Sequence, residues 1–133
     1  MSKLKKIFWV EDEKAFINVY EKALEGIFDV EFISLARTAL DRIKEIEKGK
    51  EEKPSLFVID LLLPDMNGVI VLDEIKKIES LKDIPAFILT NYGEVKDREK
   101  FIDGLEVEKY LVKTKWPPSK LIPLIKETIE LKS

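Results

Sequence analysis

Residues 55–68 read SLFVIDLLLPDMNG, a short apolar run followed by an aspartate and a segment rich in turn-forming residues. The run 55–59 has the length and the β-branched and aromatic content of a strand that is buried on both faces. The run ends at Asp60. The segment 64–68 combines proline, aspartate, asparagine and glycine, so we interpret it as a turn without chemistry of its own.

Apolar runs of the same kind occur on both sides of this stretch, and residues with helical spacing follow each of them. Strands are predicted over 4–10, 28–34, 55–59, 84–89 and 107–112, and helices over 16–24, 36–48, 69–78, 94–103 and from 117 onward. Strands that alternate with helices favour a parallel sheet with helices on both faces. The sequence thus predicts an α/β fold built on a doubly wound, five-stranded parallel sheet.

Length and composition narrow the class of protein. The chain has 133 residues, the usual size of one domain, so 1–133 is expected to form a single domain. It contains no Cys and no His, which excludes a zinc knuckle, a thiol nucleophile and a phosphohistidine of its own. The net charge of −3 gives no indication of binding to nucleic acid or a membrane surface. No long apolar span and no signal-peptide pattern is present, so a cytoplasmic location is expected.

Polar residues stand where the predicted strands end. They are Glu11 and Asp12 after the first strand, Asp60 after the third, Thr90 after the fourth and Lys113 after the fifth. The carboxyl ends of parallel strands share one edge of a sheet, which is where ligands bind in open α/β sheets. Closely packed carboxylates favour a hard divalent cation such as Mg²⁺. An Asp carboxylate can also attack phosphorus, so this set of residues predicts phosphoryl transfer onto Asp60.

These residues, together with Tyr110 in the segment KYLVK, occur in the order and at the strand ends typical of one family. On them, the chain from about 3 to 131 resembles the receiver domain of the two-component response regulators. The resemblance implies a flavodoxin-like fold with strand order 2-1-3-4-5. It also implies that Asp60 is the phosphoacceptor, and that Glu11, Asp12, Asp60 and the backbone carbonyl of Leu62 form the Mg²⁺ site.

The resemblance also implies a switch. Lys113 would pair first with Asp60 and then with the phosphoryl group, and the hydroxyl of Thr90 would donate to a phosphoryl oxygen. Tyr110 would then turn from an exposed to a buried position. This would change the surface formed by the fourth helix, the fifth strand and the fifth helix, where a downstream protein would bind.

Four residues raise questions of their own. Thr114 follows Lys113 where the family usually has a proline with a cis peptide bond, so the geometry of that bond is left open. Asn91 follows Thr90 where a small residue is common, and its larger side chain could narrow access to Asp60. Leu62 and Tyr92 occupy the two positions that tune dephosphorylation in the family, and neither has a carboxylate or amide to orient water. We therefore expect a long-lived phosphoryl group on Asp60.

The favoured hypothesis is a stand-alone receiver, since 133 residues leave no room for an output domain. Its donor would be a histidine kinase or a histidine phosphotransfer protein, and its output would be binding to a protein target. We expect a monomer or a weak phosphorylation-dependent dimer, and no enzyme activity beyond self-catalysed phosphorylation and slow dephosphorylation. Two alternatives remain: a receiver-like docking module that no longer switches, and an Asp-nucleophile phosphatase. The phosphatases usually carry a second Asp where Leu62 stands.

Overall fold

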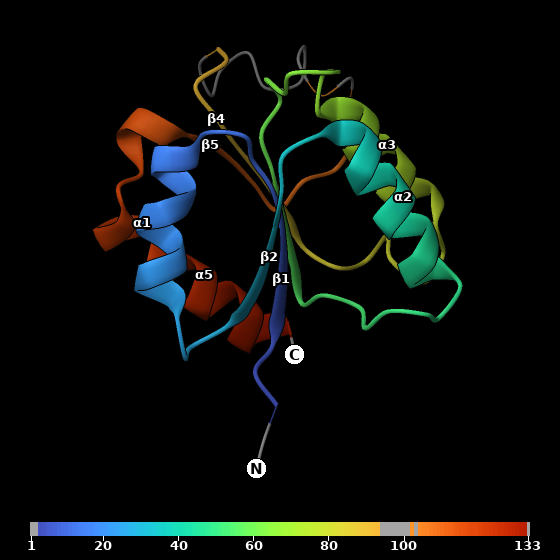
Figure 1. Ribbon diagram of the computed structural model, residues 1–133, viewed down its shortest axis with the longest axis horizontal. Coiled ribbons are helices and arrows are strands. Elements are labelled where there is room, and N and C mark those ends of the chain that lie inside the picture. The colour runs from blue at the N-terminus through green and yellow to red at the C-terminus, as the bar shows by residue number, and fades with distance from the viewer. Residues whose placement is uncertain (1–2, 94–101, 103, 133) are drawn as a thin grey trace.

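The computed structural model describes residues 3–93, 102 and 104–132 (Figure 1). Within these residues, five strands form one parallel sheet in the order β2-β1-β3-β4-β5. The strands are β1 (Lys6–Val10), β2 (Asp29–Ile33), β3 (Leu56–Ile59), β4 (Ala86–Thr90) and β5 (Lys109–Val112). The predicted fold class and strand order are therefore confirmed.

Helices cover both faces of the sheet. They are α1 (Lys14–Leu24), α2 (Ala36–Glu47), α3 (Val69–Lys77) and α5 (Pro118–Lys132). Helices α1 and α5 lie on one face, and α2 and α3 lie on the other (Figure 1). The helix predicted over 94–103 lies outside the described residues except at Ile102, which is buried.

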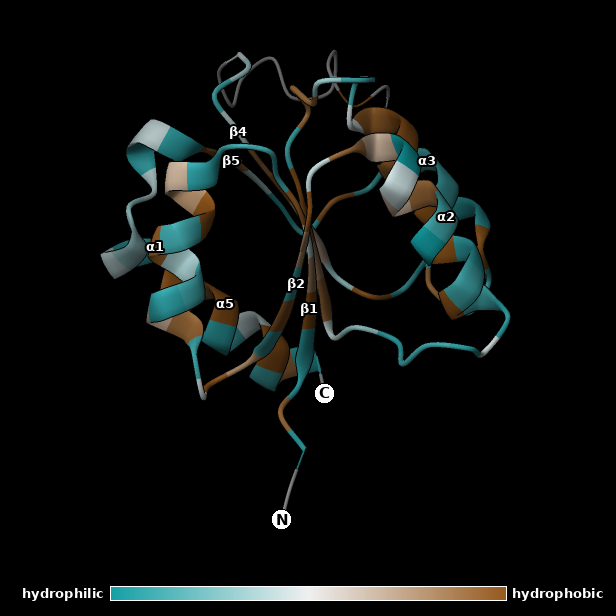
Figure 2. Ribbon diagram, viewed as in Figure 1, coloured by the Kyte–Doolittle hydropathy of each residue, from teal (hydrophilic) through white to brown (hydrophobic). Residues whose placement is uncertain are grey.

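The central strands separate two apolar layers. Phe8 and Phe57 pack into the layer under α2 and α3, whereas Trp9 and Val58 pack into the layer under α1 and α5. All four side chains are fully buried, as expected for parallel strands with both faces covered. The apolar sides of the helices face the sheet (Figure 2). With both faces filled, polar groups can gather only where the strands end.

The predicted strand boundaries agree with the observed ones to within two residues. Strand β4 begins at Ala86 instead of residue 84. Pro85 precedes it and lacks the N–H group that a strand residue donates. Its carbonyl still accepts a hydrogen bond of 3.0 Å from the N–H of Phe57. Strands β1, β3 and β5 end where the sequence predicts, and β2 and β4 end within one residue of the predicted position, so that Thr90 is the last residue of β4 and does not follow it.

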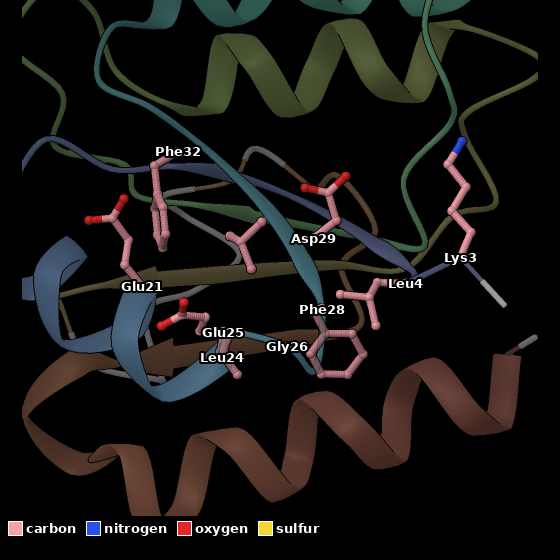
Figure 3. Close-up of a pocket in the computed structure, with 10 residues that line it drawn as sticks. Lys3, Leu4, Glu21, Leu24, Glu25, Gly26, Phe28, Asp29 and Phe32 are labelled. Atoms are coloured by element: carbon pink, nitrogen blue, oxygen red, sulfur yellow. The ribbon is translucent and has the colours of Figure 1, made fainter. Parts of the chain in front are cut away.

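A groove of about 470 Å³ lies along the outer edge of β2 and the end of α1 (Figure 3). Apolar side chains such as Leu24 and Phe28 line it together with the carboxylates of Glu21, Glu25 and Asp29. None of the polar residues predicted for the site lines this groove. Among the described residues, no helix has the length and apolar character needed to cross a membrane.

Candidate functional site

Three carboxylates meet at the carboxyl ends of β1 and β3. The N–H of Glu11 donates to the carbonyl of Ile33 at 2.8 Å, and that of Asp60 donates to Val10 at 3.0 Å. These bonds carry the backbone pairing of the sheet one residue past each strand. Carboxylate oxygens of Glu11, Asp12 and Asp60 consequently lie within 4.8 Å of one another, an arrangement that can hold a metal ion.

Lys113, which follows β5, closes the site from the other side. Its Nζ lies 2.8 Å from Oε1 of Glu11 and 2.9 Å from Oδ2 of Asp60. The side chain of Lys113 is only 7% exposed. Burial by itself would lower the pKa of Lys113, but its hydrogen bonds to Glu11, Glu13 and Asp60 raise the pKa above the ordinary value. Lys113 is therefore a firmly protonated cation.

Glu11 is the most buried of the three acids. Its residue is 0% exposed, and burial raises its pKa above the ordinary value despite the hydrogen bond from Lys113. Oε1 of Glu11 lies 2.8 Å from the ammonium of Lys113, and among the described residues it accepts no hydrogen bond. A buried carboxylate oxygen in this position suits an additional cation.

Thr90 and Tyr110 are connected through the backbone of Tyr92. The N–H of Tyr92 donates to Oγ1 of Thr90 at 3.2 Å, and the hydroxyl of Tyr110 donates to the carbonyl of Tyr92 at 2.7 Å. Both Thr90 and Tyr110 are buried. The structure thus links the two residues predicted to form the switch, and it places Tyr110 in the buried position.

Sequence reasoning missed two residues that contact Lys113. Oε1 of Glu13 lies 2.9 Å from Nζ, and the ring of Phe16 lies below the ammonium with its centroid at 4.6 Å. Glu13 adjoins the acidic pair, which was a signal that it belongs to the site. Phe16 had the spacing of an ordinary core residue and offered no such signal.

The segment 64–68 is a turn in the structure, as predicted, but two of its residues make structural contacts that the sequence did not indicate. A Cβ atom on Gly68 would lie 2.0 Å from the backbone oxygen of Asp60, so only glycine fits there. Asp65 accepts hydrogen bonds of 2.9 and 3.0 Å from the N–H groups of Ala36 and Arg37. This segment therefore packs directly against the candidate site and α2.

Asn91 and Thr114, the residues that follow Thr90 and Lys113 and differ from those usual in the family, are joined by a hydrogen bond. The N–H of Thr114 donates to Oδ1 of Asn91 at 3.3 Å, a bond that a proline at 114 could not make. All peptide bonds of the described residues are trans, including that between Lys113 and Thr114.

A family model of the response regulator receiver domain matches residues 7–126. The chain belongs to this family. Receiver domains are signalling modules of two-component systems that interact with histidine kinases and downstream effectors, and are generally not enzymes. The acidic cluster that can hold a metal ion therefore lies in a receiver domain.

This receiver domain is 30% identical over 109 residues to the response regulator protein VraR of Staphylococcus saprophyticus. The match covers 82% of this chain and 49% of VraR, so the chain spans about half the length of that relative. It is also 31% identical over 110 residues to a probable methanogenesis regulatory protein, FilR2, of Methanothrix harundinacea, covering 80% of this chain and 70% of that protein.

Among solved structures, it resembles the phosphorylated cyanobacterial phytochrome response regulator RcpA, with a TM-score of 0.74 and 29% identity. That match covers 97% of this chain and 91% of RcpA. The match to the Mn²⁺-bound form of the response regulator Rcp1 has a TM-score of 0.71 and 28% identity, and covers 97% and 92% of the two chains.

Proposed function

We propose that this receiver domain accepts a phosphoryl group on Asp60 in a Mg²⁺-dependent reaction and thereby switches its surface for partner binding. The observation that carries the proposal is the environment of Asp60. This aspartate is 5% exposed, lies 2.9 Å from the ammonium of Lys113, and shares the acidic cluster with Glu11 and Asp12. Such a carboxylate is positioned as a nucleophile beside a fixed positive charge.

The reaction would begin with attack of an Asp60 carboxylate oxygen on the phosphorus of a phosphohistidine. The bond between phosphorus and nitrogen breaks, and the donor imidazole keeps the electron pair. Because these 133 residues contain no His, the phosphohistidine would lie outside them, on a histidine kinase or a histidine phosphotransfer protein. Lys113 would then pair with a phosphoryl oxygen. Thr90 accepts from Tyr92 through Oγ1, which leaves its hydroxyl proton for another phosphoryl oxygen.

The donor atoms present fit Mg²⁺, which prefers oxygen ligands and uses few protein carboxylates. Asp12, Asp60 and the backbone carbonyl of Leu62 would hold it directly, and Glu11 would act through a bound water. When bound, Mg²⁺ would supply positive charge that offsets the repulsion between the carboxylates and the incoming phosphoryl group.

The hydrogen bonds through Tyr92 support a coupling between Thr90 and Tyr110. A phosphoryl group on Asp60 would draw the hydroxyl of Thr90 toward itself. We expect this to shift the backbone of Tyr92, and with it the carbonyl that accepts the hydrogen bond from Tyr110. A downstream protein would bind the changed surface of β5 and α5, together with the segment 94–103, of which only Ile102 is among the described residues. The whole process would take place in the cytoplasm.

Substitution of Asp60 with Asn should abolish phosphorylation, because the amide is not a nucleophile toward phosphorus. The measurement is the intact mass of the protein after incubation with Mg²⁺ and a small-molecule phosphodonor. We expect the wild type to gain one phosphate only when Mg²⁺ is present, and Asp60→Asn to gain none. Asp41→Asn, an exposed position on α2, is the control and should label like the wild type.

Other outcomes of the same experiment would favour the alternatives. A wild-type protein that gains no phosphate and binds no beryllofluoride would be a docking module that has lost the switch. Turnover of phosphate esters would indicate a phosphatase. Equal labelling of the wild type and Asp60→Asn would place the acceptor elsewhere and contradict the proposal.

The phosphoryl group on Asp60 should be long-lived in the isolated protein. Leu62 and Tyr92 are 52% and 38% exposed, and neither carries a carboxylate or amide to orient an attacking water. The combined substitution Leu62→Asn and Tyr92→Glu should shorten the half-life at least about tenfold, because water positioning by a suitable group is a large rate factor. Decay is followed by intact mass, with Ile70→Asn on α3 as the control. An unchanged half-life in the double variant would contradict this prediction.

A further inference from the structure

Helix α2 begins without a cap from its own sequence. The residue before it is Leu35, which has no side chain able to accept a hydrogen bond, and the first turn contains no acidic residue. The first N–H groups of a helix have no partner within the helix and carry a partial positive charge. An acceptor for them must therefore come from elsewhere in the chain or from solvent.

Asp65 supplies that acceptor from a segment about thirty residues away in the sequence. Its two carboxylate oxygens bind the N–H groups of Ala36 and Arg37 separately, at 2.9 and 3.0 Å. These hydrogen bonds, that to Arg37 foremost, hold the pKa of Asp65 below its ordinary value. The carboxylate is therefore charged at neutral pH and serves as the cap of α2.

The segment that carries Asp65 is also tied to the site. Leu62 and Asn67 form an antiparallel bridge across it, and the N–H of Gly68 donates to the carbonyl of Leu61 at 2.8 Å. The N–H of Leu62 donates to Oδ1 of Asp60 at 3.0 Å. The segment is thus a closed loop with Asp60 at its base and Asp65 toward its tip.

We propose that Asp65 is a positioning residue: by capping α2 it fixes the loop 61–68, so that Leu62 keeps its place beside Asp60. The proposal rests on the proposed function in one respect, namely that the carbonyl of Leu62 is a ligand of Mg²⁺. The hydrogen bond from the Leu62 N–H to Asp60 is independent of the metal. Loss of the cap should therefore make both the carbonyl and the N–H group of Leu62 more mobile.

The test separates loop positioning from helix stability. Asp65→Ala removes the cap and the loop anchor together. The double variant Leu35→Asp with Asp65→Ala places a capping side chain at residue 35, directly before α2, where the backbone is extended as an N-cap requires. It leaves the loop 61–68 unanchored. Asp73→Ala on α3 removes a carboxylate that pairs with the exposed Lys77 at 2.9 Å, and serves as the control.

Three quantities are measured: amide hydrogen exchange at Leu62 without metal, exchange at Ala36 and Arg37, and the dissociation constant of Mg²⁺. In Asp65→Ala we expect all three amides to exchange faster. We also expect the Mg²⁺ constant to rise about threefold to tenfold, less than the roughly 10–100-fold typical when a group bonded directly to a ligand is lost. In the double variant the helix amides should recover, whereas Leu62 exchange and Mg²⁺ binding should not.

Recovery of Leu62 exchange and of Mg²⁺ affinity in the double variant would overturn the proposal, because stabilising α2 would then suffice. Unchanged Leu62 exchange in Asp65→Ala would overturn it as well. A wild type that binds no Mg²⁺ would contradict the proposed function, whereas faster Leu62 exchange in both Asp65 variants would still support the anchoring role.

Discussion

Substitution of Lys113 with Gln should lower the free energy of unfolding by about 3–5 kcal/mol at neutral pH without Mg²⁺, the usual effect of removing one partner from buried charges. Lys113 is the cation that lies within 2.9 Å of both Glu11 and Asp60, and these two acids are almost completely buried. Without it, two carboxylates would remain close together without an ammonium to offset their charge. Urea denaturation of the purified proteins measures the change.

Two further variants test the cause of this effect. Lys126→Gln, at an exposed position on α5, should leave stability almost unchanged. Adding Asp60→Asn to Lys113→Gln should recover much of the loss, because one of the unpaired carboxylates is then neutral. Equal stability of Lys113→Gln and the wild type would show that the buried acids do not depend on Lys113.

The same substitution should also slow phosphorylation. The rate in Lys113→Gln should fall at least about 100-fold, as when a charge-stabilising donor is lost from an active site.

Substitution of Gly68 with Ala should disable the site with a modest loss of stability. The added Cβ would lie 2.0 Å from the backbone oxygen of Asp60, so the loop or the end of β3 must move. Overpacking of this kind costs about 1–3 kcal/mol. A displacement of about 1 Å at a reacting group can reduce its rate roughly 100-fold, so phosphorylation should fall by about that factor.

Gly26→Ala is the matched control. Gly26 has a φ of +77° with nothing within 4 Å of an added Cβ, so alanine there causes backbone strain of about 1–2 kcal/mol without touching the site. Thermal denaturation should show a comparable loss of stability in the two variants. Measurements of intact mass should show slower phosphorylation in Gly68→Ala only. A Gly68→Ala protein that labels at the wild-type rate would show that the loop adapts without moving Asp60.

The sequence was informative about the site where function coincides with a strand end. Glu11, Asp12, Asp60, Thr90 and Lys113 each follow or end a buried strand, and the structure places them all at the carboxyl edge of the sheet. The carboxylate cluster and the pairing of Lys113 with Asp60 were predicted, and both are present. The roles of these residues in phosphoryl transfer remain predictions.

Residues whose contacts come from distant segments were not predictable in this way. Asp65 looked like part of a turn, yet it caps a helix that begins 29 residues earlier. Phe16 had the spacing of a core residue, yet its ring also lies beneath Lys113. The departures at Asn91 and Thr114 were noted separately, and their shared hydrogen bond is visible only in the structure.

The α/β class and the edge of the sheet that carries the acids could both be predicted from the amino-acid sequence. Apolar runs and helical spacing are local patterns, and parallel strands bring their carboxyl ends together whatever the details of packing. The three-dimensional packing was needed to show that Glu13 and Phe16 also contact Lys113, why Gly68 must lack a side chain, and where Tyr110 lies. Those answers depend on distances between segments remote in the chain, and such distances leave no periodic pattern in the sequence.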